Sequence, residues 1–283
     1  MPKKFIYIFL FFLGIVLVII LYIQYDKSNR HFSVTFLNVG QGDSALIKFS
    51  NGEKMLVDCG IDQKVLQGLG RNMPFYDRTI DYLLVTHPDL DHYGGCPGVL
   101  KRYDVKNIIT NGEEKSGDQY WSAWKKYLEE ENAVNKVINE KQELEIGDSE
   151  INFLYPGNDV ALDEKLREGN NKSIIFTLQN NNKKFLFMGD AEVPLENALM
   201  QKYCVTSTPI ICPTLKSDYI KIGHHGSDSS SGELFLDIVN AKKAIISVGK
   251  NTFGHPSFRI LKKLQRAGAE VFRTDKLGDI TLP

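Results

Sequence analysis

The sequence predicts an α/β domain of about 250 residues behind one membrane-spanning helix. Residues 5–23 form an apolar stretch of 19 residues without a charge. After residue 31 the chain alternates between short apolar runs of strand length and longer segments of helical periodicity. Hydrophobic residues make up 42% of the chain, which is enough for a sizeable core. We therefore expect residues 1–30 to hold a cytoplasmic stub and an anchor, and residues 31–283 to form one domain.

The apolar stretch at residues 5–23 has the dimensions of a membrane anchor. At a rise of 1.5 Å per residue it is about 28 Å long, close to the ~30 Å hydrocarbon core of a bilayer. The residues after it, QYDK, are bulky and polar, unlike a signal-peptide cleavage site. Lys3 and Lys4 precede it, and positive charge favours the cytoplasmic side. The sequence thus predicts a single-pass cell-membrane protein with an extracellular domain.

Strands and helices are predicted in order along the first half of the domain. A glycine loop at residues 40–42 separates two strands, and apolar runs of strand length follow it. The predicted strands cover residues 32–38, 44–49, 54–58, 79–85 and 105–110. Amphipathic patterns predict helices over residues 63–68, 95–103 and 120–131.

The second half begins with two predicted hairpins. Gly147 and Asp148 mark the turn of the first, and the asparagines at 180–182 mark the turn of the second. The flanking strands cover residues 143–148, 150–154, 174–179 and 184–188. Later strands are predicted at 219–222, 244–248 and 270–273, and helices at 194–203 and 258–267. Pro194 suits the first turn of its helix.

The most informative motif is THPDLDH at residues 86–92, directly after a predicted buried strand. It holds four potential metal ligands in six residues, namely His87, Asp89, Asp91 and His92. Imidazole nitrogen and carboxylate oxygen suit Zn²⁺, Mn²⁺ or Fe. A solvated acidic turn with incidental histidines is the alternative. Two of the six histidines of the chain fall here, which favours a metal site.

Further ligand-type residues follow other predicted strands. Asp190 follows strand 184–188, although a lone aspartate there is often a turn residue or helix cap. His224 and His225 follow strand 219–222, and extended backbone would turn them to opposite faces. We therefore expect only one of them to bind metal, with a slight preference for His224, which is nearer the strand. His255 follows strand 244–248 and alone would be a loop histidine.

Taken together, these motifs resemble the metallo-β-lactamase fold superfamily, and most closely its ComEC-like branch, the hydrolase-like domain of a DNA-uptake channel. Further matching motifs are VGQGDS at 39–44, LVDCG at 56–60, DHYGG at 91–95, NNKS at 170–173 and NTFGHP at 251–256. The resemblance covers roughly residues 32–283. It implies a four-layer αββα sandwich, a topology that the pattern of elements alone does not define.

The resemblance also implies how the ligands share one or two divalent ions, Zn²⁺ or Mn²⁺. His87 and Asp89 would hold one ion, and Asp91 and His92 the other. Asp190 would bridge them, and His224 or His225 would complete the second site. The common motif of the superfamily has histidine where Asp89 stands, and a further histidine is missing from the region of Asn170, Asn171 and Ser173. The first site is therefore richer in oxygen, which favours Mn²⁺ relative to Zn²⁺.

Other residues are assigned supporting or catalytic roles. Asp58 ends a strand and is expected to orient a ligand histidine. We assign Asp43, Asn170, Ser173 and Ser227 to similar supporting contacts or to contacts with substrate. The predicted catalytic residues are Asp91, His225 and His255. His255, or the unbound member of the histidine pair, would protonate the leaving oxygen.

Three function classes follow from these observations. The first is a phosphodiesterase, a nuclease acting on DNA outside the membrane. The second is a hydrolase of cell-envelope phosphodiesters, similar to phosphocholine esterases, and the third is a non-enzymatic, metal-stabilised binding module of an uptake assembly. The net charge of −1 argues against tight nucleic-acid binding by bulk charge. The sequence indicates no protein partner.

The four cysteines show no Cys-x-x-Cys spacing, which argues against a zinc knuckle. If the domain is extracellular, Cys204 and Cys212 can pair, but four cysteines allow three connectivities and free thiols remain an alternative.

Overall fold

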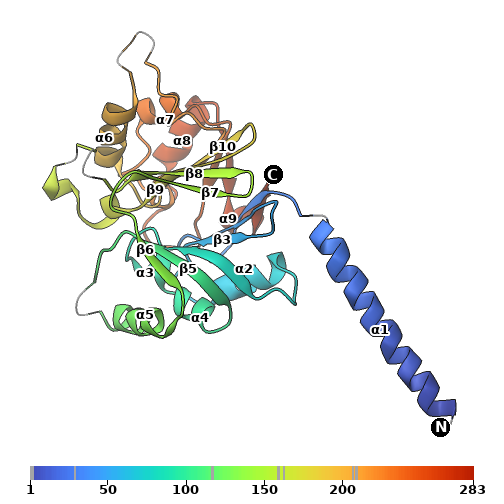
Figure 1. Cartoon of the computed structure of the whole chain (residues 1–283). Helices are drawn as coiled ribbons and strands as arrows, with labels where there is room; N and C mark the ends of the chain where they lie inside the picture. The colour runs from blue at the N-terminus through green and yellow to red at the C-terminus, as the bar shows by residue number, and fades with distance from the viewer. Residues whose placement is uncertain are drawn as a thin grey trace.

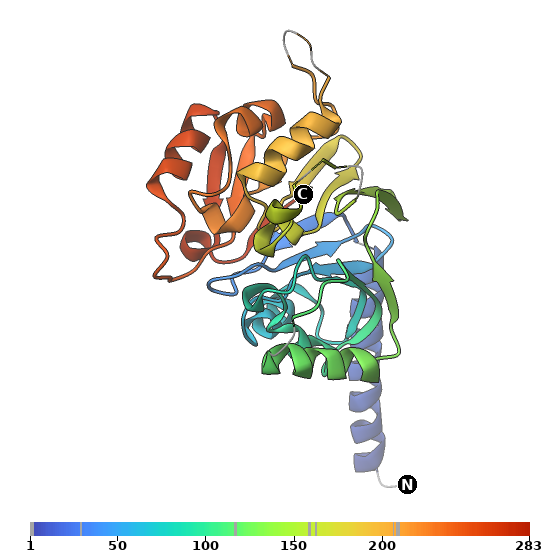
Figure 2. The same ribbon diagram turned by 90° about the vertical axis from the view of Figure 1, so that its left-hand side faces the viewer.

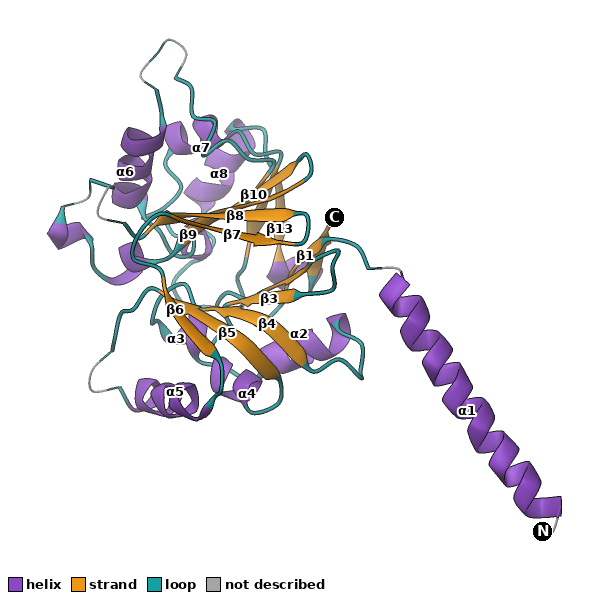
Figure 3. Ribbon diagram, viewed as in Figure 1, coloured by secondary structure: helices purple, strands orange, loops and turns teal. Residues whose placement is uncertain are grey.

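The computed structural model describes residues 3–28, 30–115, 118–157, 160–161, 163–205, 207 and 210–283. Two seven-stranded sheets lie face to face, with helices on both outer sides (Figures 1 and 3). This arrangement confirms the predicted four-layer αββα sandwich. The first sheet runs in the order β14 (Ile280–Leu282), β1 (Ser33–Phe36), β2 (Ala45–Lys48), β3 (Lys54–Val57), β4 (Thr79–Leu84), β5 (Asp104–Thr110), β6 (Val134–Val137).

The second sheet runs in the order β13 (Glu270–Arg273), β12 (Lys243–Ile246), β11 (Tyr219–Lys221), β10 (Lys183–Phe187), β9 (Ile175–Asn180), β8 (Ser149–Tyr155), β7 (Gln142–Ile146). In each sheet one half is antiparallel and the other half parallel. Strands β3 to β6 are parallel, as are β10 to β13. The carboxyl ends of parallel strands meet at one edge of a sheet, so the loops that follow β3, β4, β10, β11 and β12 can share one site.

The helices form the two outer layers. They are α2 (Lys64–Asn72), α3 (Leu90–Tyr93), α4 (Cys96–Leu100) and α5 (Gln119–Glu130) on the first sheet, and α6 (Val193–Tyr203), α7 (Glu233–Val239), α8 (Phe258–Arg266) and α9 (Thr274–Leu277) in the second half of the chain. Three short 3₁₀ turns complete the chain, η1 (Glu164–Leu166), η2 (Gly169–Lys172) and η3 (Gly223–Gly226). Helices α5, α6 and α8 agree with the predicted helices within one residue at each end.

Two predicted helix ends are wrong. Helix α2 does not stop at Gly68 but continues to Asn72. A Cβ at position 68 would lie 3.1 Å from Leu37 Cδ1, so this glycine allows close packing within the helix rather than ending it. Helix α4 ends at Leu100, three residues before the predicted end, because the chain turns there to enter β5.

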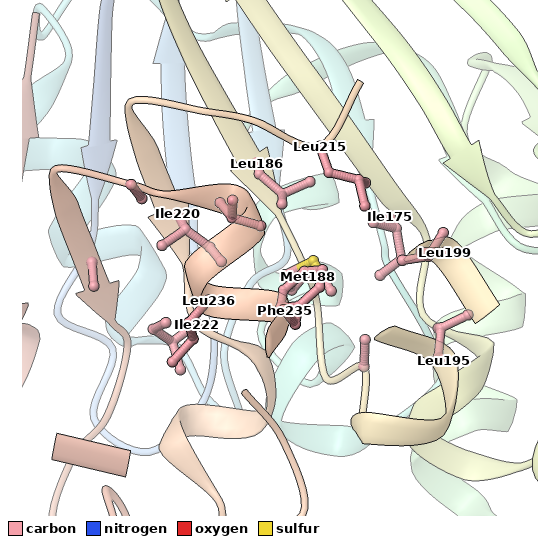
Figure 4. Packing of buried hydrophobic residues seen from close by; sticks show 14 of the residues in the cluster. Ile175, Leu186, Met188, Leu195, Leu199, Leu215, Ile220, Ile222, Phe235 and Leu236 are labelled. Carbon is pink, nitrogen blue, oxygen red and sulfur yellow. The ribbon is translucent and has the colours of Figure 1, made fainter. Parts of the chain in front are cut away.

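Three hydrophobic clusters hold the layers together. The cluster between the sheets includes Phe176 and Phe187, whose rings stack with centroids 4.5 Å apart. The cluster under α4 and α5 contains the buried rings of Tyr93 and Trp124. The cluster under α6 and α7 is mostly aliphatic, and several of its side chains converge with Met188 and Phe235 in Figure 4. Burial of this apolar area is the main stabilising contribution to the fold.

Helix α1 (Lys3–Ser28) projects away from the sandwich as a separate rod (Figures 1 and 2). The candidate span covers residues 3–25, and its most apolar part is not buried against the domain. By length and composition the helix is able to cross a membrane. It is the only helix of this kind in the described part of the chain.

All four cysteines are paired, Cys59 with Cys96 and Cys204 with Cys212. The sequence left paired and free cysteines open, and the structure shows the Cys204–Cys212 pair and no free thiol. Cys59 follows β3 and Cys96 begins α4, so this disulfide joins two segments beside the predicted metal motif.

Candidate metal centre

Side chains that suit a metal ion converge at the carboxyl ends of strands from both sheets. Several groups of three bring their ligand atoms within 4.8 Å of one another, and their members are His87, His92, Asp190, Asp91, His225, Asp43 and Asp58. Four buried atoms of this cluster lack a hydrogen-bond partner: Asp43 Oδ1, His87 Nε2, His92 Nε2 and Asp190 Oδ1. Buried polar atoms are normally paired, so this set of nitrogen and oxygen atoms fits a divalent cation.

His92 is held by the carboxylate of Asp58. Its Nδ1 lies 2.9 Å from Asp58 Oδ2, and its Nε2 lies 3.3 Å from Asp190 Oδ1. The backbone N–H and the hydroxyl of Thr86 also donate to Asp58, both at 2.8 Å, which fixes that carboxylate. Because Asp58 is an acceptor, Nδ1 carries the proton and Nε2 is free for an ion. This is the contact expected of Asp58, and its role remains a prediction.

His225 has a similar arrangement. Its Nδ1 lies 2.9 Å from the carbonyl oxygen of Ser247 and 3.2 Å from Asp43 Oδ1. Its Nε2 lies 3.1 Å from Asp91 Oδ2 and 3.4 Å from Asp190 Oδ2. Both partners of Nδ1 are acceptors, so Nε2 is again the nitrogen available to an ion.

The buried carboxylates of the cluster need nearby positive charge to compensate them. Burial opposes protonation of His92 and His225, but the surrounding carboxylates, Asp190 first, raise the pKa of both imidazoles well above the ordinary value. Burial also opposes ionisation of Asp91, yet contact with His225 holds its pKa at about 2. Without a metal ion, protons on the imidazoles balance the carboxylates, so metal binding and proton release are coupled.

The glycine loop before β2 holds the backbone of Asp91 in place. The backbone N–H of Asp43 donates to the carbonyl oxygen of Asp91 at 3.1 Å. A Cβ at Gly42 would lie 2.3 Å from that same oxygen, and Gly42 has a φ of +128°. Only glycine permits this close approach, which explains why the glycine loop and the ligand motif occur together.

The backbone at His224 and His225 is not extended, so that prediction is wrong. Both residues adopt left-handed conformations, with φ of 46° and 51°. His224 faces away from the cluster, with Nδ1 3.3 Å from Glu192 Oε1 and 3.2 Å from Asn170 Nδ2. The preference for His224 as ligand does not fit this geometry, which places His225 at the cluster. The glycines that flank the pair, at 223 and 226, were the sequence signal for a turn.

His87 and Asp89 form one half of the cluster, which is called the outer half below. Asp91, His92 and His225 form the inner half, and Asp190 is shared by both. The hydroxyls of Thr86 and Ser173 lie 3.1 and 3.2 Å from His87 Nδ1, and Asp89 Oδ2 lies 3.5 Å from His87 Nε2. Asp89 also accepts a hydrogen bond from Lys115 Nζ at 2.6 Å. Contact with His87, followed by that with Lys115, lowers the pKa of Asp89. The carboxylate that would serve the first ion is therefore already paired with a cation.

Lys221 is a site residue that the sequence reasoning missed. Its side chain is only 4% exposed, and Nζ donates to the carbonyl oxygen of Gly189 at 2.8 Å. Nζ also forms an ion pair with Asp43 and lies 3.7 Å from Asp190 Oδ1. Burial opposes its charge, but the carboxylates of Asp43 and Asp190 raise the pKa of Lys221. A lysine inside the apolar strand YIKI was the signal for a buried carboxylate partner.

The remaining predicted residues surround the cluster, and two of them, Ser173 and Ser227, are buried. Asn170 donates to Glu192 Oε1 at 3.1 Å, and Ser173 receives a hydrogen bond from the backbone of Asp190 at 2.9 Å. The ring of His255 lies 5.3 Å from that of His224, and burial, followed by the nearby charge of His224, lowers the pKa of His255. Ser227 contacts the hydroxyl of Ser229 at 3.0 Å and supports the loop after the histidine pair.

Comparisons with known proteins agree with this geometry. The family model of the metallo-beta-lactamase superfamily matches residues 37–250. ComE operon protein 3 of Bacillus subtilis is 29% identical over 274 residues, covering 87% of this chain and 32% of that protein. Competence protein ComA of Neisseria gonorrhoeae is 27% identical over 248 residues, covering 87% of this chain and 31% of that protein. The chain thus spans about a third of the length of these curated relatives.

Solved structures show the same fold. The metallo-beta-lactamase fold protein YhfI from Bacillus subtilis superimposes with a TM-score of 0.56 over 89% of this chain and 99% of its own, at 11% sequence identity. At that identity the likeness supports the fold alone. The family match over most of the chain, together with the αββα sandwich, shows that this protein belongs to the metallo-β-lactamase superfamily.

Proposed function

We propose that this protein is a membrane-anchored, metal-dependent phosphodiesterase that acts on DNA. The observation that carries the proposal is the convergence of Asp91, His92, Asp190 and His225, with buried nitrogen and oxygen atoms that have no hydrogen-bond partner. The competence protein among the relatives favours DNA over other phosphodiesters.

The residues that would hold the ions fall into two sets. Asp91, His92, Asp190 and His225 would hold the inner ion, and His87 and Asp89 would hold the outer ion together with Asp190. The mixed nitrogen and oxygen set suits both Mn²⁺ and Zn²⁺. When bound, such ions lower the pKa of water and neutralise charge on a phosphoryl oxygen.

The chain's own residues position and balance these ligands. Asp58 keeps His92 in one tautomer, and the carbonyl oxygen of Ser247 does the same for His225. Lys221 balances the charge of Asp43 on the buried side, which reduces the negative charge that the ions must offset.

A proton for the leaving oxygen must come from the exposed side. The lowered pKa of His255 leaves this imidazole mostly neutral near pH 7. His224 is partly exposed, and its Nδ1 lies 3.3 Å from Glu192 Oε1 on the side away from the buried ligands. We therefore assign proton donation to His224, with His255 packed against it at a ring distance of 5.3 Å.

The location proposed for the domain is the outer face of the cell membrane, with α1 as the anchor. Two disulfides support this location, because disulfides persist in oxidising compartments and are rare in the cytosol. Lys3 and Lys4 before the apolar stretch support the same orientation. Protease treatment of intact cells should remove the domain, whereas protection until lysis would contradict the orientation.

Turnover of phosphodiesters by the full-length protein in detergent tests the proposed activity. The protein is incubated with Mn²⁺ or Zn²⁺ and with linear DNA, plasmid or bis(p-nitrophenyl) phosphate. We expect cleavage of all three, loss of activity with chelator, and recovery on adding metal back. Cleavage of the small diester but not of DNA would favour an envelope phosphodiester as substrate. Metal binding without any cleavage would favour the binding module.

A further inference from the structure

We propose that Phe253 forms a stacking platform for a nucleobase beside the metal centre. The inference rests on the proposed function, because the base would belong to a nucleotide whose phosphate binds at the ions. Phe253 is 73% exposed, although it lies in the loop that carries His255. An exposed aromatic ring at the edge of a polar site offers a flat face on which a base can stack.

A row of aromatic rings connects Phe253 to the buried ligands. The ring of His225 lies 6.1 Å from that of His224, and His224 lies 5.3 Å from His255. The ring of His255 in turn lies 5.7 Å from that of Phe253, with 32° between the planes. The row begins at a buried metal-ligand candidate and ends at an exposed ring. A nucleotide can therefore place its phosphate at the inner end and its base at the outer end.

Asn251 fixes the loop that presents Phe253. Its Oδ1 accepts from the backbone N–H groups of Phe253 and His255, both at 3.0 Å. Its Nδ2 donates to the carbonyl oxygens of Gly249 at 2.9 Å and His255 at 2.8 Å. The side chain thus satisfies four backbone groups of a single turn. A ring on a preorganised loop loses little conformational entropy when a ligand binds.

The chemistry favours a nucleobase as the occupant. Every base has a flat π-face, and stacking on an aromatic side chain contributes about 1–3 kcal/mol per base with little regard to sequence. Lys250, which is exposed and precedes Asn251 in the chain, adds positive charge near the loop for a phosphate backbone.

Phe258 provides a matched control. It is 72% exposed, only five positions further along the chain, at the start of α8. Its ring faces Lys262, whose Nζ lies 5.5 Å from the ring centroid, and no described ring contact joins it to the histidine row. Loss of Phe258 removes the same apolar area without touching the proposed platform.

The test compares two short DNA oligonucleotides that differ only in one base next to the scissile phosphate, natural in one and replaced by an abasic tetrahydrofuran in the other. With full-length protein and Mn²⁺, we expect kcat/KM to be roughly tenfold higher for the natural oligonucleotide, within the range that stacking provides. F253A should abolish this preference, F253W should keep it, and F258A should leave it unchanged.

Binding gives a second readout that does not depend on turnover. Thymidine 5′-monophosphate and deoxyribose 5-phosphate are titrated into metal-loaded protein, and F253A should weaken only the first by roughly tenfold. Two outcomes would contradict the stacking platform but leave the proposed phosphodiesterase activity intact. In the first, DNA is cleaved but the wild type does not distinguish the two oligonucleotides. In the second, F253A behaves like F258A. If no diester is cleaved, the proposed function fails, and equal binding of thymidine 5′-monophosphate by wild type and F253A would overturn the platform as well.

Discussion

The inner and outer halves of the metal centre use the same ligand types but hold them differently. In the inner half, His92 and His225 each direct Nδ1 at fixed acceptors, which leaves Nε2 free for an ion. In the outer half, His87 Nδ1 contacts the Thr86 hydroxyl, whose proton is donated to Asp58, and the Ser173 hydroxyl, which can donate or accept. Asp89 is paired with Lys115. Contacts behind a ligand set its orientation and basicity. We conclude that the two ions would bind with unequal affinity.

Removal of Asp190 should have the largest effect, because it is the carboxylate shared by both halves. Asp190→Ala should release metal and reduce phosphodiesterase activity by more than the roughly 10- to 100-fold typical of contacts behind a ligand. Elemental analysis and turnover measure the two effects, and circular dichroism checks the fold. Asp62→Asn, which changes an exposed carboxylate whose described side-chain contacts are with Lys64, is the control. Full metal content in the Asp190 variant would remove the basis of the proposed site.

Asp89→Ala separates the two halves. This variant should lower the metal content toward one ion per chain and keep the inner ion, since Asp89 lies outside the groups formed by Asp91, His92, Asp190 and His225. Stoichiometry is measured by titration of metal-free protein with Mn²⁺. Release of both ions would show that the two halves bind metal as one unit and would contradict the distinction between them.

Asp58→Asn tests the contact behind His92. The amide can still accept a hydrogen bond but carries no charge, so metal affinity should fall by roughly 10- to 100-fold without a change in stoichiometry. Isothermal titration measures the affinity. An unchanged affinity would mean that Asp58 supports the fold through Thr86 rather than the ligand.

The two disulfides should differ in their effect on the centre. Cys59 follows Asp58, and its backbone N–H donates to the carbonyl oxygen of His92 at 2.6 Å, whereas Cys204 and Cys212 pair at the end of α6. Chain entropy gives about 4 kcal/mol for the 37-residue separation and about 2.5 kcal/mol for the separation of 8. Replacing Cys59 and Cys96 by alanine should lower both stability and metal affinity.

Replacing Cys204 and Cys212 should lower stability alone. Urea unfolding of both double variants measures the loss of stability, and metal titration measures the change in metal affinity. Equal metal affinities would show that the disulfide beside the ligands contributes only to the fold.

The last prediction concerns an effect on stability away from the ligands. Glu196 accepts backbone N–H groups of Ser231 and Gly232 at 2.5 and 2.8 Å, in the loop after the histidine pair. Burial raises the pKa of Glu196 to about 7 from 4.5. Between these values the folded protein holds a proton that the unfolded chain has lost, so stability should fall as pH rises from about 4.5 to 7. Glu196→Gln should remove this component of the pH dependence, by at most about 3 kcal/mol. Urea unfolding at pH 5 and pH 7.5 measures it, and parallel slopes for both proteins would contradict it.

The sequence predicts the sandwich, and places the candidate ligand motif at the end of a strand, because both depend on local patterns. Apolar runs of strand length define β4 and β10, and ligand-type residues that follow them must lie at the site edge. Predictions failed where a distant contact decides the structure. Strand β14 has only three residues and exists because it pairs with β1, almost 250 positions away. Likewise, the sequence patterns of β6 and α7 are too short to identify these elements from the sequence alone.

Within the site, the same distinction holds. The identity of the ligand motif can be read from residues 86–92, but the left-handed turn at His224 and His225 depends on the packing of the loop over Asp190 and Ser247. Lys221 was missed because its partners, Asp43 and the carbonyl oxygen of Gly189, come from two other strand ends. The local sequence indicates that a lysine in an apolar strand needs a partner, but not which distant residues supply it.

The short connection between α1 and the sandwich limits where a membrane-anchored form can act. Helix α1 ends at Ser28 and β1 begins at Ser33, so even a fully extended connection spans roughly 18 Å. The domain would then search a thin layer above the lipid rather than the surrounding volume. Within that layer, two-dimensional diffusion raises the effective concentration of any substrate held at the same surface. The anchor would therefore favour DNA already captured at the membrane over DNA free in solution.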